Sequence, residues 1–196
     1  MVSLSRLSPT ITNMIRLDHT HVFATFHQYS QDKSPDTKQA LANTICLALE
    51  IHAQLEEEVF YPAMRSVIPQ DDTLAKSVPE HNEVKQLITR LRNCHPEDKS
   101  FDPTLMELMR HTIHHVADEE TNLLPAAEKL LGIPKLRELG TKMTKLRIKL
   151  VAPHGGEIAR DTYRGFKQNP LFWAIGVATL AIAVHAIRQP LYAKTS

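Results

Sequence analysis

The sequence is poor in glycine, aromatic residues and cysteine, and it carries no excess of charge of either sign. None of its 6 glycines precedes Gly132, and apolar residues recur every three and four positions, which predicts a helical bundle and excludes a sheet. Its 2 cysteines, Cys46 and Cys94, follow no metal-binding spacing and are too few for a disulfide scaffold, which favours a reducing compartment. A net charge of +1 leaves no basic surplus to neutralise phosphates, so we expect no nucleic-acid partner.

Histidine, in contrast, is abundant, and one pattern containing it occurs twice. A histidine is followed four residues later by a glutamate at His52 and Glu56, and again at His115 and Glu119. Each copy is preceded, at nearly the same spacing, by an acid–histidine pair that ends in His19 or in His81. On a helix, residues i and i+4 share a face, so each histidine–glutamate pair can reach a common centre. The repeat predicts two helical hairpins that close around one metal site.

The apolar periodicity predicts four helices, at about 9–29, 35–65, 72–93 and 103–123. The four histidines and two glutamates all fall on the apolar stripes of these helices, which must face the core. A buried carboxylate without a partner destabilises a small bundle by several kcal/mol. A divalent or trivalent cation would compensate both carboxylates together.

Two metal ions would use the whole set, each held by two imidazoles and both bridged by the two carboxylates. A mixed nitrogen and oxygen set suits iron or manganese better than calcium, which prefers oxygen ligands. Structural zinc would more commonly use cysteine and would need no second carboxylate. About four protein donors per metal leave open positions, where dioxygen, peroxide or nitric oxide could bind.

Other residues of the repeat have less certain roles. Glu57 and Glu120, directly after the inward glutamates, are expected to be surface charges. Asp18 and Glu80, directly before His19 and His81, either orient a histidine ring or lie on a solvated face. Pro62 and Pro125 are expected to kink or end their helices on the same side of the site.

The C-terminal part differs in composition from the rest. Residues 133–170 are expected to form a basic helical linker, and an uncharged apolar run follows from Leu171 to Ile187. This run is predicted to be a transmembrane or tail-anchor helix that holds the bundle at the cytoplasmic face of a membrane, in bacteria the inner membrane. The alternatives are a helix that packs on the bundle or pairs two chains, and a cytoplasmic protein.

The segments LDHTHV, HAQLEEEVFYP, PEHNEV and HHVADEETNLLP resemble the ligand segments of the hemerythrin-like, HHE cation-binding family over about residues 9–132. The resemblance implies a non-haem di-iron centre, oxo- or hydroxo-bridged, with manganese as the other metal considered. Its ligands would be His19, His52, Glu56, His81, His115 and Glu119. Oxygen-carrying hemerythrins have a further histidine where this chain has Lys85, so the resemblance does not extend to a fifth imidazole.

The predicted fold is therefore all-α. An up-down four-helix bundle of the hemerythrin type (residues 1–132) is followed by the basic helix (133–170) and the apolar, transmembrane helix (171–187). The predicted function is binding or sensing of dioxygen, nitric oxide or peroxide at a di-iron centre. Two alternatives stay open: a di-iron enzyme with peroxidase, oxidase or nitric-oxide-detoxifying activity, and a membrane-tethered bundle that metal merely stabilises.

Overall fold

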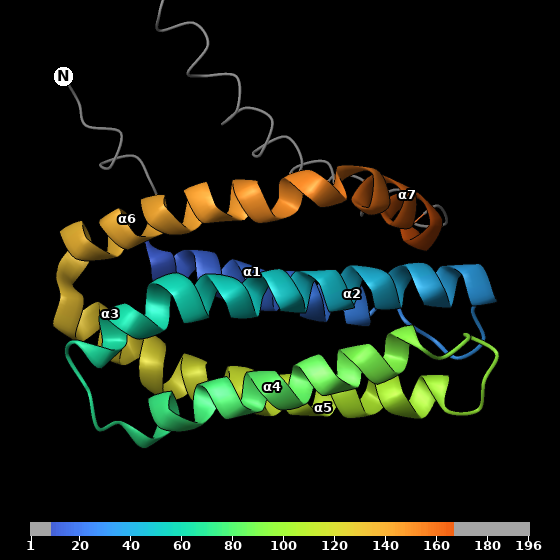
Figure 1. Ribbon diagram of the computed structural model, residues 1–196, viewed down its shortest axis with the longest axis horizontal. Coiled ribbons are helices and arrows are strands. Elements are labelled where there is room, and N and C mark those ends of the chain that lie inside the picture. Colours follow the sequence, from blue (N-terminus) through green and yellow to red (C-terminus); the bar gives the residue numbers. More distant parts are fainter. Residues whose placement is uncertain (1–8, 167–196) are drawn as a thin grey trace, which may run out of the picture.

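The computed structural model describes residues 9–166, and all regular structure in this range is helical. Four helical rods form the bundle (Figure 1). They are α1 (Ile11–Phe26); α2 (Pro35–Leu55), continued by η2 (Glu56–Phe60) and α3 (Tyr61–Arg65); α4 (Asp72–Arg92); and α5 (Phe101–Asp118), continued by η3 (Glu119–Leu123) and the start of α6 (Leu124–Val151). The hairpins α1–α2 and α4–α5 correspond to the two copies of the sequence pattern.

Side-chain caps define where the helices begin. Ser34 caps α2 by accepting a hydrogen bond from the Thr37 amide, and Pro35 occupies the first turn. The first helix begins at Ile11, slightly later than the expected start near residue 9, and it is capped by Thr10, whose hydroxyl accepts from the Asn13 amide at 3.3 Å. The inward stripes keep the phase that the periodicity predicts, since His19 and Ile15 both lie buried.

The core consists of two apolar clusters. One contains Ile15, Phe60 and Leu123, and the other contains Ile45 and Leu105, each with further buried neighbours. The buried histidines and glutamates belong to neither cluster. They form a polar layer that requires its own compensation for lost hydration.

The helix α6 bends at Gly132, whose φ of 69° lies in the left-handed region that glycine tolerates. Beyond this bend it lies over α1 and α2, with Leu139 and Met143 buried (Figure 1). The contact is close, because a Cβ atom on Gly140 would lie 2.1 Å from the carbonyl oxygen of Pro9. After η4 (Ala152–His154), α7 (Gly155–Phe166) packs on α2. The basic segment that was expected to be a linker is thus helical and packed on the bundle from residue 133 to residue 166.

The expected fold was wrong in including a transmembrane helix. No helix within residues 9–166 is both long enough and apolar enough to cross a membrane. The apolar run from Leu171 to Ile187, on which the prediction rested, lies outside the described residues.

Candidate metal centre

The structure brings the six predicted residues together in the polar layer of the bundle. The four histidines lie on four different helices, and the two glutamates are the first residues of η2 and η3. Potential ligand atoms lie within 4.8 Å of one another in two groups that share Glu56. The first group is His19, His52, Glu56 and Glu119, and the second is Glu56, His81 and His115. All six side chains are buried, and both glutamates are completely inaccessible.

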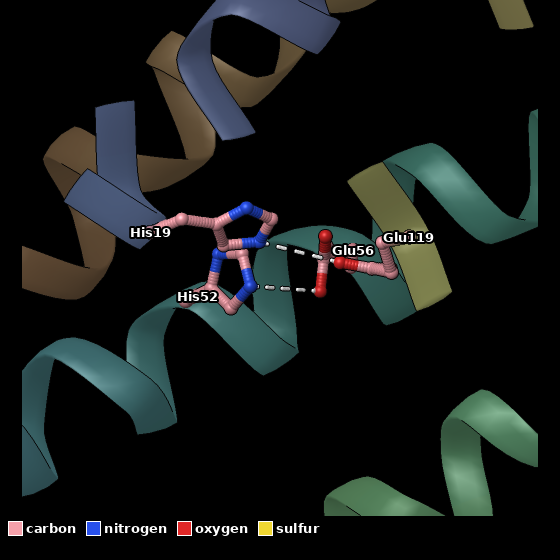
Figure 2. Close-up of side chains that lie close together, drawn as sticks. All are labelled: His19, His52, Glu56 and Glu119. Carbon is pink, nitrogen blue, oxygen red and sulfur yellow. Dashed lines mark ion pairs between the residues drawn. The ribbon is translucent and has the colours of Figure 1, made fainter. Parts of the chain in front are cut away.

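Each glutamate lies between one histidine of the first hairpin and one of the second. Glu56 Oε2 is 3.1 Å from His52 Nε2 and 3.5 Å from His81 Nε2. Glu119 Oε2 is 3.3 Å from His19 Nε2 and 3.6 Å from the Nε2 of the histidine four residues before it. Figure 2 shows the first group, with both carboxylates directed at the imidazoles of α1 and α2. This arrangement suits two carboxylates that bridge two cation positions.

Both glutamates open a wide helical turn. The amide of Tyr61 donates to the carbonyl of Glu56, and the amide of Leu124 donates to that of Glu119, each five residues back. The prolines that follow, at 62 and 125, lie in the first turn of the next α-helix, so they neither end nor interrupt the rods. The expectation that Pro62 and Pro125 end their helices was therefore wrong. Such π-helical turns are rare and occur frequently at functional sites.

The wide turn also aims Tyr61 at the site. In an α-helix of regular pitch, residue 61 would not share the face of Glu56, whereas a five-residue turn stacks the two. The Tyr61 hydroxyl donates to Glu119 Oε1 at 2.9 Å and lies 3.3 Å from Glu56 Oε2 and 3.2 Å from His81 Nε2. The second copy has Leu124 at this position, so the phenol breaks the twofold symmetry of the site.

A second set of acids holds the outer nitrogens of the histidines. Glu57 accepts from His81 Nδ1 at 2.9 Å, and Glu120 pairs with His19 Nδ1 at 2.8 Å. Each of these contacts joins one hairpin to the other. The sequence-based view of Glu57 and Glu120 as surface charges was therefore wrong. Acceptors at this place fix the ring orientation of a metal-binding histidine and raise its basicity.

The acids that precede the first histidine of each copy complete this set. Glu80 pairs with His115 Nδ1 at 2.8 Å, and Asp18 Oδ2 lies 3.5 Å from His52 Nδ1. Neither acid serves the histidine next to it in sequence; each reaches across to the following helix. The structure thus favours the orienting role over the solvated one for both.

Three of these four acids also form an ion pair with a lysine or arginine side chain. Arg16 Nε is 3.1 Å from Glu120, Lys85 Nζ is 2.8 Å from Glu57, and Arg147 of α6 forms a double hydrogen bond to Asp18. Lys85 stands where oxygen-carrying hemerythrins have a further histidine. Its side chain is 41% exposed and pairs with Glu57, so it acts on the outer acid and not at the buried centre.

The buried charges shift the acidity of the centre. Burial and the neighbouring Glu119 raise the pKa of Glu56 well above its usual range. Burial lowers the pKa of His52 to about 4, which keeps its ring neutral and able to bind a metal. Although burial works the other way, the adjacent carboxyl groups of Glu119 and Glu56 raise the pKa of His19 to about 9. Without a metal, a proton on His19 offsets the negative charge of Glu119.

The chemistry of the donor atoms fits metal ions. Among residues 9–166, four atoms that face the centre are buried and have no hydrogen-bond partner: His19 Nε2, His52 Nε2, Glu56 Oε1 and Glu119 Oε2. Each such group costs about 1–3 kcal/mol when it is left unsatisfied. A mixed nitrogen and oxygen set of this kind suits iron or manganese.

A small cavity adjoins the four histidines. Its volume is about 20 Å³, and its wall is almost entirely apolar, with Val22, Leu49 and Val84 among its lining residues. On α2, Leu49 precedes His52 by about one turn whereas Tyr61 follows Glu56, so the cavity and the phenol lie on opposite sides of the centre along the bundle. The volume corresponds to roughly one water-sized molecule.

Comparison with known proteins agrees with this geometry. The model of the family described as the hemerythrin HHE cation binding domain matches residues 10–127. The chain belongs to this hemerythrin HHE family. A crystal structure of a hemerythrin HHE cation binding domain-containing protein from Mycobacterium kansasii has the same fold, with a TM-score of 0.65 at 17% identity. The match covers 77% of this chain and 93% of the mycobacterial one.

Two curated relatives match over shorter parts of their own lengths. An uncharacterized hemerythrin-like protein of Schizosaccharomyces pombe is 26% identical over 131 residues, which is 66% of this chain and 64% of the relative. A protein of Nostoc named DNA nickase is 29% identical over 147 residues, 75% of this chain. This chain spans only 42% of that cyanobacterial protein. The comparisons establish a hemerythrin-like, cation-binding domain.

Proposed function

We propose that this hemerythrin HHE domain holds two iron ions and binds dioxygen or nitric oxide beside them. His19 and His52 would hold one ion, His81 and His115 the other, and Glu56 and Glu119 would bridge both. The observation that carries the proposal is the small apolar cavity against the four imidazoles.

Reduced iron held by these residues would supply an electron-rich centre able to bind a diatomic gas. The protein determines which small molecule can reach the iron. A cavity of about 20 Å³ admits one small molecule, and away from the histidines its wall is formed largely by apolar side chains such as Val22 and Val84. Neutral dioxygen and nitric oxide lose little hydration on entering such a space, whereas peroxide gives up several hydrogen bonds to water and meets a largely apolar wall. The cavity therefore favours the two gases over peroxide.

An enzymatic role is the second candidate, because of Tyr61. Its hydroxyl lies within hydrogen-bond distance of both bridging carboxylates and is completely buried. A phenol in this place can deliver a proton to the centre, and reduction of an oxidant consumes protons. A protein that only carries or senses a gas does not require this supply.

Absorption spectra of the iron-loaded, anaerobically reduced protein separate these functions. A binding protein forms an adduct with dioxygen or nitric oxide that reverses when the gas is removed. An enzyme returns at once to its oxidised spectrum and consumes the oxidant.

Two substitutions at Val84 test the cavity itself. Val84→Phe should fill the space and abolish the adduct, and Val84→Ala should retain it, with both variants keeping two irons. Equal gas binding by the two variants would show that the cavity is not the binding place.

DNA nicking, named for the cyanobacterial relative, has no comparable support in this chain. The alignment leaves more than half of that relative unmatched, and the net charge of +1 offers no basic surplus toward DNA.

A further inference from the structure

Asp18 differs from the three other acids that face the outer nitrogens of the histidines. The other three contacts are 2.8–2.9 Å long, whereas Asp18 Oδ2 is 3.5 Å from His52 Nδ1. Within the described part of the chain, this nitrogen has no hydrogen-bond partner although it is buried. His52 is thus the least firmly supported of the four imidazoles.

The cause is visible on the other side of Asp18. Both of its oxygens are engaged by one guanidinium, with Arg147 Nη1 2.6 Å from Oδ1 and Nη2 2.7 Å from Oδ2. Such a bidentate fork is among the strongest pairings available to a carboxylate. Glu120 is arranged differently, since Oε2 accepts from Arg16 at 3.1 Å and leaves Oε1 for His19 at 2.8 Å.

Arg147 does not belong to the four-helix bundle. It lies on α6 beyond the bend at Gly132, in the part of that helix that covers α1 and α2. The close approach of Gly140 to Pro9 fixes the position of this helix along α1. The Arg147–Asp18 pair therefore joins an element outside the bundle to a histidine of the candidate metal centre.

We propose that Arg147 and His52 compete for Asp18, so that the position of α6 and the occupancy of the metal centre are linked. The proposal rests on metal binding through His52 Nε2. A cation at Nε2 withdraws electrons from the ring and makes Nδ1–H a stronger donor, which draws Asp18 toward His52. The guanidinium fork is weakened by the same movement. Arg147 is in this account a positioning residue that acts on His52 through Asp18.

The linkage must operate in both directions. Metal binding loosens the contact of α6 with α1, and a partner or substitution that removes Arg147 from Asp18 strengthens metal binding. An ordinary supporting residue has the opposite effect, because its loss weakens the ligand that it supports. The sign of the change in affinity therefore identifies the mechanism.

The first test measures Fe²⁺ affinity of the full chain, without oxygen, in competition with a chromophoric chelator. Arg147→Met should raise the affinity by up to about tenfold, the low end of what outer partners of metal-bound histidines contribute. Arg147→Lys, which can release one oxygen of Asp18, should give a smaller rise. The matched control Arg16→Met should give no rise, because Glu120 already serves its histidine.

Asp18→Asn completes a double-mutant cycle with Arg147→Met. It should lower the affinity for Fe²⁺, and Arg147→Met should have no further effect in that background. A fall or no change in affinity on Arg147→Met alone overturns the proposal. A wild-type chain that binds no Fe²⁺ overturns the proposed function instead, so the two failures are distinguishable.

Amide hydrogen exchange provides an independent readout that does not depend on activity. Addition of Fe²⁺ to the wild-type chain should increase exchange in residues 140–151 of α6 and decrease it in α5, which carries the ligand His115. Arg147→Met should abolish the increase in α6. Protection of α6 that rises with metal, as in a helix merely stabilised by the centre, contradicts the competition.

Discussion

Replacement of Glu56 by glutamine should stabilise the metal-free protein while abolishing its metal centre. Glu56 is completely buried, and its Oε1 has no hydrogen-bond partner among residues 9–166. Burial and the adjacent Glu119 raise the pKa of Glu56 in the folded, metal-free state. In the unfolded chain the same carboxyl ionises near its ordinary value of about 4.3. Its stabilising contribution is thus complete below that pH and is lost as the pH rises toward the folded value.

The size of the effect follows from this difference in pKa. Each pH unit between the unfolded and folded values costs the wild type about 1.4 kcal/mol, because the unfolded chain releases a proton that the folded chain retains. Glutamine does not ionise, so Glu56→Gln avoids this loss. Glu56→Gln should therefore be more stable than the wild type at pH 7. The gain there cannot exceed about 4 kcal/mol, because pH 7 lies only about 2.7 units above the unfolded pKa, and it should almost vanish at pH 4.5.

Thermal unfolding in the presence of a chelator, at pH values from 4.5 to 8, measures this gain directly. Glu58→Gln is the matched control, since Glu58 is exposed and its carboxylate accepts a hydrogen bond from Gln54, one helical turn before it. This substitution should change stability by less than about 0.5 kcal/mol. With added iron the order should reverse, because only the wild type gains stability from binding. The reasoning is refuted if metal-free Glu56→Gln is no more stable than wild type at pH 7, or if the difference does not change with pH.

Three further predictions concern residues around the centre. Glu57→Gln should lower metal affinity by about 10–100-fold through His81, whereas Glu58→Gln should leave it unchanged; equal effects in a chelator competition would mean that the contact to His81 does not matter. Tyr61→Phe should keep two irons but slow the return of the reduced protein to its oxidised spectrum if the phenol supplies a proton, and stopped-flow absorption would show an unchanged rate if it does not. In the wild type, removal of metal by a chelator should lower the melting temperature, and a chain equally stable with and without iron would contradict the role of the buried glutamates.

The helices and their inward faces could be predicted from the sequence because burial of apolar side chains dominates a bundle of this kind. The stripe that contains Ile15 also contains His19, and the same phase holds on α2 up to Glu56. The six candidate ligands can be recognised on these apolar stripes, since an unpaired charge in a core is costly. The duplication then indicates that they meet.

The apolar periodicity did not predict which residues face the site beyond the point where the helix changes its pitch. A five-residue turn after Glu56 rotates everything that follows, and this turn brings Tyr61 to the site and keeps Pro62 within a continuous rod. The role of Glu57 was missed because a residue beside the inward face was taken to point to solvent, although it reaches a histidine on the neighbouring hairpin. Its repetition as Glu120 was the available signal. The contact between Arg147 and Asp18 had no sequence signal, because it depends on where α6 lies after its bend.

Metal content measured together with ligand variants tests the central claim most directly. The full chain, produced with ample iron and analysed by elemental spectrometry against protein concentration, should contain about two iron ions per chain. Glu119→Gln should lose the paired centre, whereas Glu58→Gln should keep it. One ion per chain, zinc retained in the presence of iron, or an unchanged iron content in Glu119→Gln would contradict a centre of two ions bridged by Glu56 and Glu119.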